Sequence, residues 1–282
     1  VCSPTTGANQ SCNRPPIASS APAGSDPTAI TIIGAVITGG ATGIGLGIAK
    51  ALGARGANVV IASRKKENLE KAEELLRGAG VKGEVAHYVL DVREPEAVAE
   101  VAERVAERFG PAEILVNNAA GNFVVPAAEL SPNGWRTVVD IVLNGTFYCS
   151  HAFGTRMMEA QVAGTIINIV ATYAWTGGPG TSHSAAAKAG VLSLTQTLAV
   201  EWGVRGVRTN AIAPGPIQDT GGAERLFAAP EVAEAVRRGV PLGRFGRPEE
   251  IGEIAAWLAS DQAAYVNGAC IVADGGAWLN KG

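Results

Sequence analysis

Residues 38–45 read Thr38-Gly39-Gly40-Ala41-Thr42-Gly43-Ile44-Gly45 and lie between an apolar run at 29–37 and a helical pattern at 46–53. The apolar run predicts a buried parallel strand, and the pattern after the glycines predicts the first turns of a helix. Glycine lets the backbone approach a phosphate closely, and a helix N-terminus points free N–H groups at it. The stretch therefore predicts a phosphate-binding turn, with a tight turn that binds no ligand as the alternative.

The composition indicates one large α/β domain, or at most two small ones, because the chain has 282 residues, of which 47% are hydrophobic and 17% charged. A net charge of −3 predicts no nucleic-acid partner. No apolar run approaches the roughly 20 residues that cross a bilayer, so we expect no membrane partner. The four cysteines form no close pair and only three histidines occur, which predicts neither a metal site nor a disulfide framework. We therefore expect a cytoplasmic protein.

Residues 1–28 differ from the rest in being rich in Ser, Pro, Thr, Ala, Asn and Gly. They contain few large apolar residues and no basic start, so they predict a disordered tail rather than a signal peptide. Residues 29–282 are expected to form the single domain, in which the polar stretch 217–240 is interpreted as a mobile substrate lid.

Short β-branched runs alternate with helical patterns along this domain, which predicts a doubly wound, Rossmann-type, mostly parallel seven-stranded sheet. Strands are expected at residues 29–37, 58–62, 85–90, 114–116, 164–170, 207–213 and 270–272. Helices are expected at residues 46–53, 65–77, 95–109, 135–160, 181–203 and 248–258. In the helix at 65–77, the side chains expected to face the core are Leu69, Ala72, Leu75 and Leu76.

The second expected strand, at 58–62, runs into Ser63, and three cations follow directly: Arg64, Lys65 and Lys66. In a dinucleotide fold this position meets the adenosine ribose, where an acid favours NAD and Arg accommodates the 2′-phosphate of NADP. No acid stands here, and cations at a helix start are disfavoured by the helix dipole unless an anion is bound. A solvated helix start is the alternative; we favour NADPH.

Five segments in order resemble the short-chain dehydrogenase/reductase family over about residues 36–279: 38–45, Asp91-Val92, 117–121, Asn144 in the next helix, and 214–217. The resemblance implies a nicotinamide cofactor and a set of residues that bind it. These are Thr38, Gly39, Thr42, Gly43, Ile44, Gly45, Ser63, Arg64, Lys65, Asp91, Val92, Asn118, Ala119, Ala120, Lys188, Pro214, Gly215 and Ile217.

The chain departs from the family at its usual catalytic pair, Tyr-x-x-x-Lys on one helix face. Lys188 is present, but Ser184 stands at the tyrosine position, and Ala171 and Thr172 stand where the usual serine would be. An aliphatic hydroxyl has a pKa far above that of a phenol, so Ser184 is a poor proton donor to a carbonyl. A tyrosine does occur nearby, at Tyr173.

This departure resembles the 2,4-dienoyl-CoA reductases, as do segments 117–123, 130–135 and 140–146. The resemblance implies that NADPH delivers hydride to the δ carbon of a dienoyl-CoA, and that a proton at the α carbon then gives a 3-enoyl-CoA, in fatty acid β-oxidation. It implies that Tyr173 and Asn122 hold the thioester oxygen, while Lys188 and Ser184 position the cofactor. It also implies acyl-CoA contacts at Arg93, Phe123, Ser131 and Arg225.

Each of these substrate contacts has a structural alternative: a surface ion pair for either arginine, plain packing for Phe123, and a helix N-cap for Ser131. Two interpretations of His183, beside Ser184, stay open: a catalytic group, and a surface residue, which is the one we favour. Asn144 is expected to order a water or the backbone near Lys188, or to cap a local kink.

Two other functions stay open: a carbonyl or enoyl-thioester reductase that uses Tyr173 as acid, and a non-catalytic nucleotide-binding regulator. The helices at 135–160 and 181–203 are of the kind that pack against their copies in relatives, so we expect a homotetramer.

Overall fold

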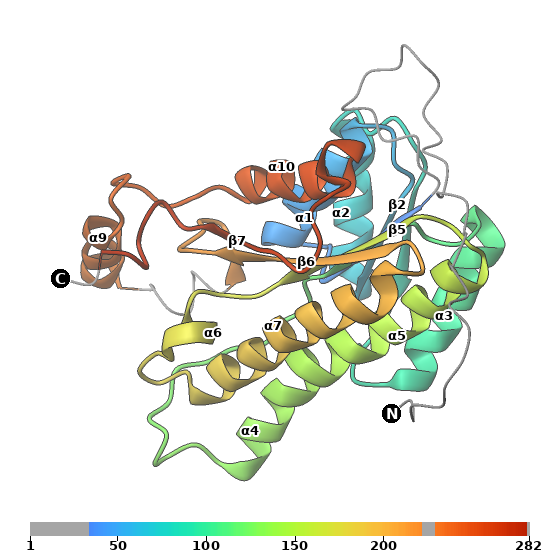
Figure 1. The fold of residues 1–282 in the computed structure, drawn as a ribbon. Coiled ribbons are helices and arrows are strands. Elements are labelled where there is room, and N and C mark those ends of the chain that lie inside the picture. Colours follow the sequence, from blue (N-terminus) through green and yellow to red (C-terminus); the bar gives the residue numbers. More distant parts are fainter. Residues whose placement is uncertain (1–33, 222–228, 281–282) are drawn as a thin grey trace, which may run out of the picture.

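The computed structural model describes residues 34–221 and 229–280 (Figure 1). The expected tail at 1–28 and Arg225 lie outside the described residues, as do the first five residues of the run expected as a strand at 29–37.

The centre of the fold is one parallel sheet of seven strands, in the order β3-β2-β1-β4-β5-β6-β7. The strands are β1 (Ala35–Thr38), β2 (Val59–Ser63), β3 (Val85–Val89), β4 (Ile114–Asn117), β5 (Gly164–Ile169), β6 (Val207–Pro214) and β7 (Cys270–Ala273). Val36 of β1 lies opposite Val60 of β2 on one side and opposite Leu115 of β4 on the other. The predicted doubly wound α/β fold is confirmed.

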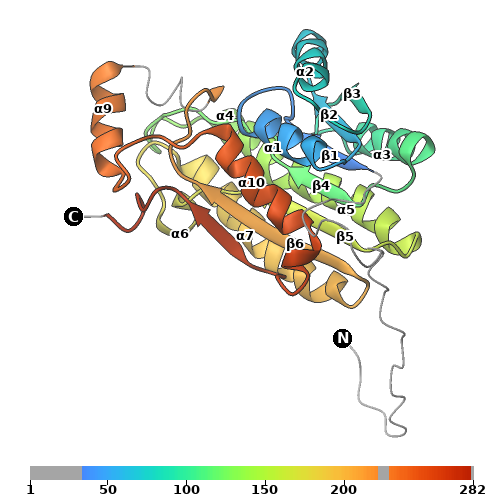
Figure 2. The ribbon, with the colours of Figure 1, turned by 90° about the horizontal axis from the view of Figure 1, so that it is seen from above.

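Helices cover both faces of this sheet (Figures 1 and 2). They are α1 (Gly43–Ala54), α2 (Lys66–Gly78), α3 (Pro95–Phe109), α4 (Pro132–Val139), α5 (Gly145–Glu159), α6 (Tyr173–Thr176), α7 (Ser182–Gly203), α9 (Pro230–Gly239) and α10 (Pro248–Ala259). One apolar core lies between the sheet and α1, α2 and α10, and a second lies between the sheet and α3, α5 and α7.

Alternate strand residues feed the two cores. Val36 joins the core under α3, α5 and α7, whereas its neighbours Ala35 and Ile37 join the other, and all three are fully buried. A strand buried on both faces needs apolar residues at every position, which explains the unbroken apolar runs in the sequence. Each fully buried Val or Ile contributes about 1.5–3 kcal/mol to stability.

The prediction that Leu75 faces the core is wrong, because its side chain is 57% exposed. Leu69, Ala72 and Leu76 are buried as expected. At 100° per residue, position 75 lies about 120° around the helix from position 69. The four apolar residues are therefore spread too widely to lie on one helix face. Three of them pack against the sheet, and Leu75 does not.

The long helix expected at 135–160 is built from α4 and α5, joined without a break by a π-helical turn at Asp140–Asn144. Asn144 donates from Nδ2 to the Asp140 carboxylate at 2.8 Å inside this turn. Asn144 thus stabilises the π-helical turn, where the helix is locally wider. This agrees with the predicted role of Asn144 at a local kink.

Helix α10 crosses α1 at two glycines and fixes the element that follows the glycine-rich turn. A Cβ on Gly47 would lie 2.5 Å from the Pro248 carbonyl oxygen, and one on Gly252 would lie 2.5 Å from the Gly47 oxygen. Only glycine permits this approach. The N-terminus of α1 is therefore held rigidly against the rest of the fold.

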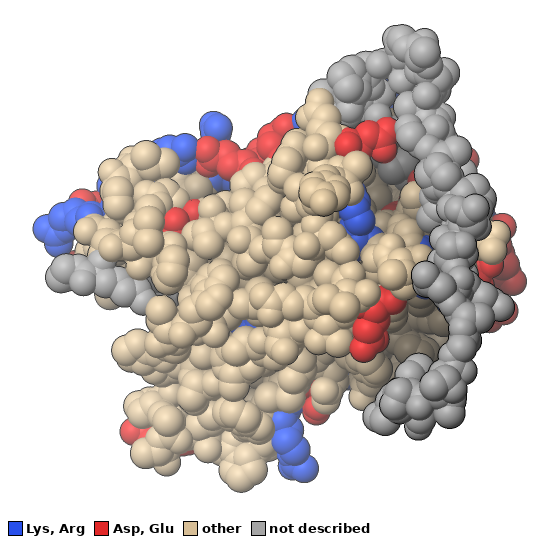
Figure 3. All heavy atoms as spheres, viewed as in Figure 1, with Lys and Arg blue, Asp and Glu red and all other residues tan. Residues whose placement is uncertain are grey.

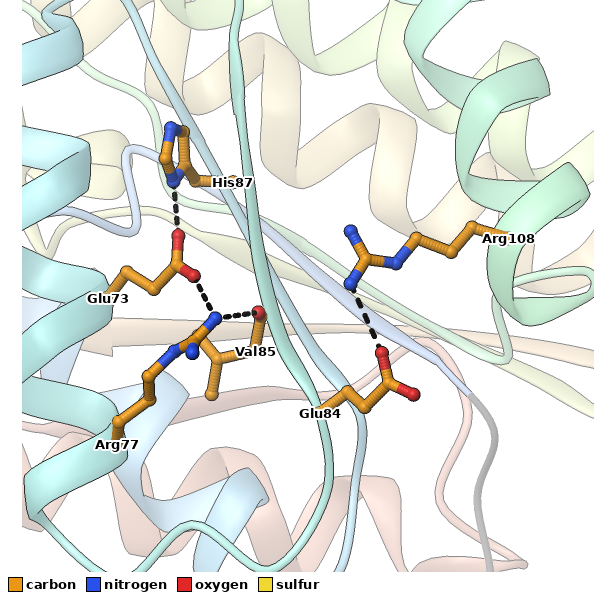
Figure 4. Close-up of polar contacts among 6 residues, drawn as sticks. All are labelled: Glu73, Arg77, Glu84, Val85, His87 and Arg108. Carbon is orange, nitrogen blue, oxygen red and sulfur yellow. Dashed lines mark hydrogen bonds and ion pairs between the residues drawn. The ribbon is translucent and has the colours of Figure 1, made fainter.

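Polar side chains tie α2 and α3 to the edge strand β3 (Figure 4). Glu73 on α2 pairs with both His87 on β3 and Arg77 of its own helix. Arg108 on α3 donates to Glu84, just before β3, at 3.1 Å. His87 thus has a structural role, which is to pair with Glu73 and hold α2 against β3.

Candidate active site

A cavity of about 740 Å³ lies at the carboxyl ends of β1 to β6. Strands β2 and β3 lie on one side of β1, and β4 to β7 lie on the other, so the strand order reverses next to β1. Ligands of open parallel sheets bind at such a reversal. Most of the predicted cofactor-binding residues line it: Gly39, Thr42, Gly43, Ile44, Ser63, Arg64, Lys65, Asp91, Val92, Asn118, Ala119, Ala120, Lys188, Pro214, Gly215 and Ile217.

The glycine-rich turn requires glycine at defined positions. Gly39 and Gly43 have φ of +64° and +52°, which side chains rarely allow. A Cβ on Gly45 would lie 2.4 Å from the Gly39 oxygen and 2.6 Å from Asn118 Nδ2. Gly45 is thus not a lining residue; it lets α1 begin directly behind the turn.

Thr38 and Asn118 join this turn to the loop after β4. The Thr38 hydroxyl accepts hydrogen bonds from the N–H groups of Asn118 and Ala119, both at 3.0 Å. Asn118 Nδ2 donates to the carbonyl oxygens of Thr38 and Gly39 at 3.0 and 3.1 Å. Two cavity walls are therefore fixed relative to each other.

These walls fit a phosphate-bearing dinucleotide. The first turn of α1 carries no acidic residue, and Gly43 and Ile44 at its N-terminus line the cavity. The dipole of this 12-residue helix and its first N–H groups favour an anion there. Farther along the cavity, β2 ends in Ser63, Arg64 and Lys65 without an acid.

Asp91 after β3 is paired with Arg93. The Arg93 Nε lies 2.9 Å from Asp91 Oδ1, and Nη2 lies 2.5 Å from Oδ2. The hydrogen bonds and charge of Arg93, with a smaller effect of Arg64, hold the pKa of the Asp91 carboxyl below its usual range despite partial burial. The carboxylate at the cavity is therefore ionised and held in place.

Tyr173, Ser184 and Lys188 meet at the end of β5. The Tyr173 hydroxyl and Ser184 Oγ lie 3.1 Å apart, although α6 and α7 carry them. Lys188, one turn after Ser184, donates from Nζ to the Ile169 carbonyl at 2.5 Å. Tyr173 and Lys188 line the cavity, whereas Ser184 is buried and reaches it only through its contact with Tyr173.

Burial shifts the pKa of both titratable groups, Tyr173 and Lys188. It raises the pKa of the Tyr173 phenol, with the Ser184 hydrogen bond opposing it weakly, so this hydroxyl keeps its proton at neutral pH. It lowers the pKa of the Lys188 ammonium to about 8. Tyr173 is thus suited to donate a hydrogen bond to a negative oxygen.

Asn122 lines the same cavity from the loop after β4. Its Oδ1 accepts a hydrogen bond from the N–H of Phe123 at 2.9 Å, which orients the amide plane. The structure therefore brings Asn122, Tyr173 and Lys188 to one cavity from three separate segments.

Of the residues predicted to contact acyl-CoA, Arg93, Phe123 and Ser131 do not line this cavity. Arg93 pairs with Asp91, and Ser131 caps α4 by accepting from the Gly134 N–H at 3.0 Å. Phe123 lies edge-on to His183, with 4.4 Å between ring centroids. The structural alternative is present in each case, and acyl-CoA contact stays a prediction for these residues, as it does for Arg225.

The expectation of a surface position for His183 is wrong, because this residue is fully buried. The loop after β4 covers it: the Val125 N–H donates to the Gly180 carbonyl at 3.0 Å, and Phe123 packs on the imidazole. Within residues 34–221 and 229–280, neither ring nitrogen has a hydrogen-bond partner.

The sequence did not indicate α6 or the contact that its Trp175 makes with Trp278. A single helical turn has no periodicity to detect. A signal did exist for the polar network behind the cavity, since Asn168 interrupts an apolar strand. Asn117 Nδ2 donates to Asn168 Oδ1 at 2.8 Å and to Ser150 Oγ at 2.9 Å.

Among the described residues, no group of three or more His, Cys, Asp or Glu is placed to hold a metal ion. No helix in the same part of the chain has the length and hydropathy to cross a membrane. On the face drawn in Figure 3, Lys and Arg form small separate groups, one of them over α9, whose last turn holds Arg237 and Arg238.

Comparison with known proteins adds three kinds of likeness. Residues 39–277 match a family described as enoyl-(acyl carrier protein) reductase. A probable 2,4-dienoyl-CoA reductase [(2E)-enoyl-CoA-producing] of Bacillus subtilis is 50% identical over 246 residues, 87% of this chain and 96% of the relative. A peroxisomal 2,4-dienoyl-CoA reductase [(3E)-enoyl-CoA-producing] of Danio rerio is 40% identical over 247 residues, 88% of this chain and 82% of the relative.

Two solved structures share the fold over most of their length. A short chain dehydrogenase from Bacillus anthracis has a TM-score of 0.82 and 49% identity, and covers 91% of this chain and 98% of its own. A putative 2-deoxy-D-gluconate 3-dehydrogenase from Agrobacterium tumefaciens with bound NADP has a TM-score of 0.83 and 33% identity, and covers 91% and 100%.

Proposed function

The chain belongs to the short-chain dehydrogenase/reductase family of oxidoreductases that use a nicotinamide cofactor, and we propose that it reduces 2,4-dienoyl-CoA thioesters with NADPH. The observation that carries this proposal is the position of Tyr173. Its hydroxyl lies 3.1 Å from Oγ of Ser184, the residue at the family's usual tyrosine position, and Tyr173 lines the cavity from a different helix. The proton-sharing group is therefore displaced rather than lost.

A displaced donor suits a conjugated thioester. When bound, NADPH supplies a hydride to the δ carbon, at the far end of the diene from the thioester oxygen. Tyr173 and Asn122 donate hydrogen bonds to that oxygen and stabilise its negative charge as the dienolate forms. Lys188 holds the cofactor ribose by its ammonium, and Ser184 orients the Tyr173 hydroxyl. A proton added at the α carbon gives the 3-enoyl-CoA.

The position of the product double bond separates two outcomes. Protonation at the α carbon gives a 3-enoyl-CoA, which is our proposal and agrees with the name of the Danio rerio relative. Protonation at the γ carbon gives a 2-enoyl-CoA, the product named for the Bacillus subtilis relative. Reduction in D₂O followed by NMR of the product distinguishes them, because deuterium enters at C2 in the first case and at C4 in the second.

The test of the function is NADPH oxidation with a 2,4-dienoyl-CoA, a 2-enoyl-CoA and a 3-ketoacyl-CoA side by side. We expect the dienoyl-CoA to have the highest kcat/KM. Preference for the 2-enoyl thioester would favour an enoyl reductase, the activity in the description of the matching family. Preference for the ketone would favour a carbonyl reductase, and no oxidation with any of them would favour a nucleotide-binding regulator.

NADPH, rather than NADH, is supported by Arg64 and Lys65 at the cavity and by the missing acid at the end of β2. We expect Arg64→Ala to reduce the preference for NADPH over NADH by about 10-fold or more, since a hydrogen bond to a charged group contributes about 1.5–3 kcal/mol. Titration of both cofactors measures this preference. Arg104→Ala, on the exposed side of α3, is the control; equal wild-type affinity for NADPH and NADH would contradict the proposal.

We also propose a homotetramer, supported by apolar side chains exposed on the helices expected to pack against their copies. Phe147 on α5 is 46% exposed and Val200 on α7 is 78% exposed. Light scattering should give the mass of four chains of 28.7 kDa. Phe147→Glu should lower this mass, whereas Val232→Glu on α9 should leave it unchanged. A monomeric mass for the wild type would overturn the assembly.

A further inference from the structure

Helix α6 carries Tyr173, yet it has only four residues and none of them is fully buried. A single helical turn is not stable by itself, because its nucleus fixes several dihedral angles for one hydrogen bond. Glycines follow it directly at 177 and 178 and add backbone freedom. The position of the Tyr173 hydroxyl therefore depends on tertiary contacts to α6.

One of these contacts comes from the far end of the chain. The Trp175 ring on α6 packs against the Trp278 ring, with 5.7 Å between centroids and 33° between planes. Such an aromatic pair adds stability beyond that of the apolar area it buries. Trp175 is still 43% exposed, so no closed core holds this side of α6. In Figures 1 and 2, α6 and the red C-terminal segment lie near the same end of the sheet.

Trp278 is itself fixed firmly. Asp274 is 8% exposed, and its carboxylate accepts hydrogen bonds from the N–H groups of Gly276 at 2.8 Å and Trp278 at 2.7 Å. Asp274 packs directly on Gly215, where a Cβ would lie 2.5 Å from the Asp274 Cβ, and Gly215 N–H donates to Ala273 at 3.0 Å. Trp278 therefore extends from a tight turn at the end of β7, and this turn packs against the cavity-lining residue Gly215.

We propose that the C-terminal turn at 274–280 supports the active site, because its Trp278 packs on Trp175 and thereby positions Tyr173 on the same helix. This inference rests on the proposed function, since it needs Tyr173 to donate to the substrate oxygen. Trp278 is a positioning residue and touches no reacting atom. Its loss leaves α6 held through the Tyr173–Ser184 hydrogen bond and backbone contacts, so the phenol samples a wider range of positions. Misplacement of about 1 Å costs on the order of 100-fold in rate.

The test is a double-mutant cycle on kcat with a 2,4-dienoyl-CoA, using Trp278→Ala, Tyr173→Phe and the double variant. We expect Trp278→Ala to lower kcat by about 10-fold, a partial misplacement of the phenol, with NADPH affinity unchanged. In the Tyr173→Phe background the same substitution should have no further effect, because the hydroxyl that it positions is absent. Trp278→Phe should restore most of kcat, since it keeps a ring on Trp175.

The controls separate positioning from general stability. Trp257→Ala, on α10 and also partly exposed, should leave kcat unchanged, and Trp175→Ala should reproduce the effect of Trp278→Ala. A wild-type kcat in Trp278→Ala, or a loss that persists in full when Tyr173 is Phe, overturns the inference and leaves the proposed function intact. Full activity of Tyr173→Phe overturns both.

Discussion

Tyr173→Phe is expected to lower kcat on a 2,4-dienoyl-CoA by about 100- to 1000-fold, the usual loss when one donor to a developing oxyanion is removed. Only the hydroxyl disappears, so NADPH affinity should stay within a factor of about two and the ring should keep its place on α6. Stopped-flow single turnovers measure the chemical step directly. Tyr265→Phe, at a fully exposed tyrosine, is the matched control.

Related substitutions sharpen this assignment. Asn122→Ala should cause a similar loss, and the double variant with Tyr173→Phe should lose much less than the product of the two, because both donors hold one oxygen. Ser184→Ala should be milder, since Ser184 acts through the 3.1 Å contact to Tyr173. Ser184→Tyr should not rescue Tyr173→Phe, because the new phenol would approach a different substrate atom. Nearly full turnover by Tyr173→Phe, with chemistry rate-limiting, would remove the main support for the dienoyl proposal.

Lys188→Met is expected to lower kcat/KM by about 100-fold or more while leaving the cofactor-free protein at least as stable as the wild type. The activity loss follows because a nicotinamide held without its ammonium partner is misplaced. The stability result follows from burial, which lowers the pKa of Lys188 from 10.5 to about 8. Such a shift means that folding costs roughly 3 kcal/mol below pH 8 to bury the charge.

The pH dependence has a definite sign. Between pH 8 and 10.5 the unfolded chain binds this proton more tightly than the folded one, so the contribution of Lys188 to the unfolding free energy rises with pH. Below pH 8 the whole cost is present, and Lys188→Met removes it. The substitution also removes the hydrogen bond to the Ile169 carbonyl, which lowers the free energy of unfolding by about 1.5–3 kcal/mol. The gain from removing the buried charge and the loss of this hydrogen bond therefore nearly balance.

Thermal unfolding at pH 7 without cofactor tests this expectation. The melting temperature of Lys188→Met should equal that of the wild type or exceed it by a few degrees, and Lys82→Met, at an exposed lysine, should leave it unchanged. A melting temperature lower by several degrees would mean that Lys188 stabilises the fold through contacts other than the Ile169 carbonyl.

Much of the fold could be predicted because parallel strands buried on both faces leave an unbroken apolar signal. The helix Pro95–Phe109 has the bounds that its pattern predicts, since proline begins it and Gly110 ends it. The prediction for Leu75 is wrong because the sequence of a helix with four apolar residues does not indicate which three of them the sheet covers. His183 was misplaced because its burial depends on a loop from another part of the chain.

The candidate site divides in the same way. Gly39 and Arg64 could be assigned to a ligand cavity from sequence, because each stands just after a strand at the carboxyl edge of the sheet. Arg93 and Ser131 could not be separated from their structural alternatives, since an ion pair or a helix cap uses the same side chains. Position after a strand is a local property, whereas the direction of a side chain depends on its neighbours.

The sequence alone determined the doubly wound sheet, the glycine-rich turn at 38–45 and the departure of Ser184 from the family's tyrosine. These features are local, because they depend on residue type, spacing and backbone freedom over a few residues. The tertiary structure decided that Tyr173 and Ser184 meet across two helices, and that Trp278 packs on Trp175 from the other end of the chain. Such contacts join segments that no local pattern links, and their geometry arises only when the sheet brings its strand ends together.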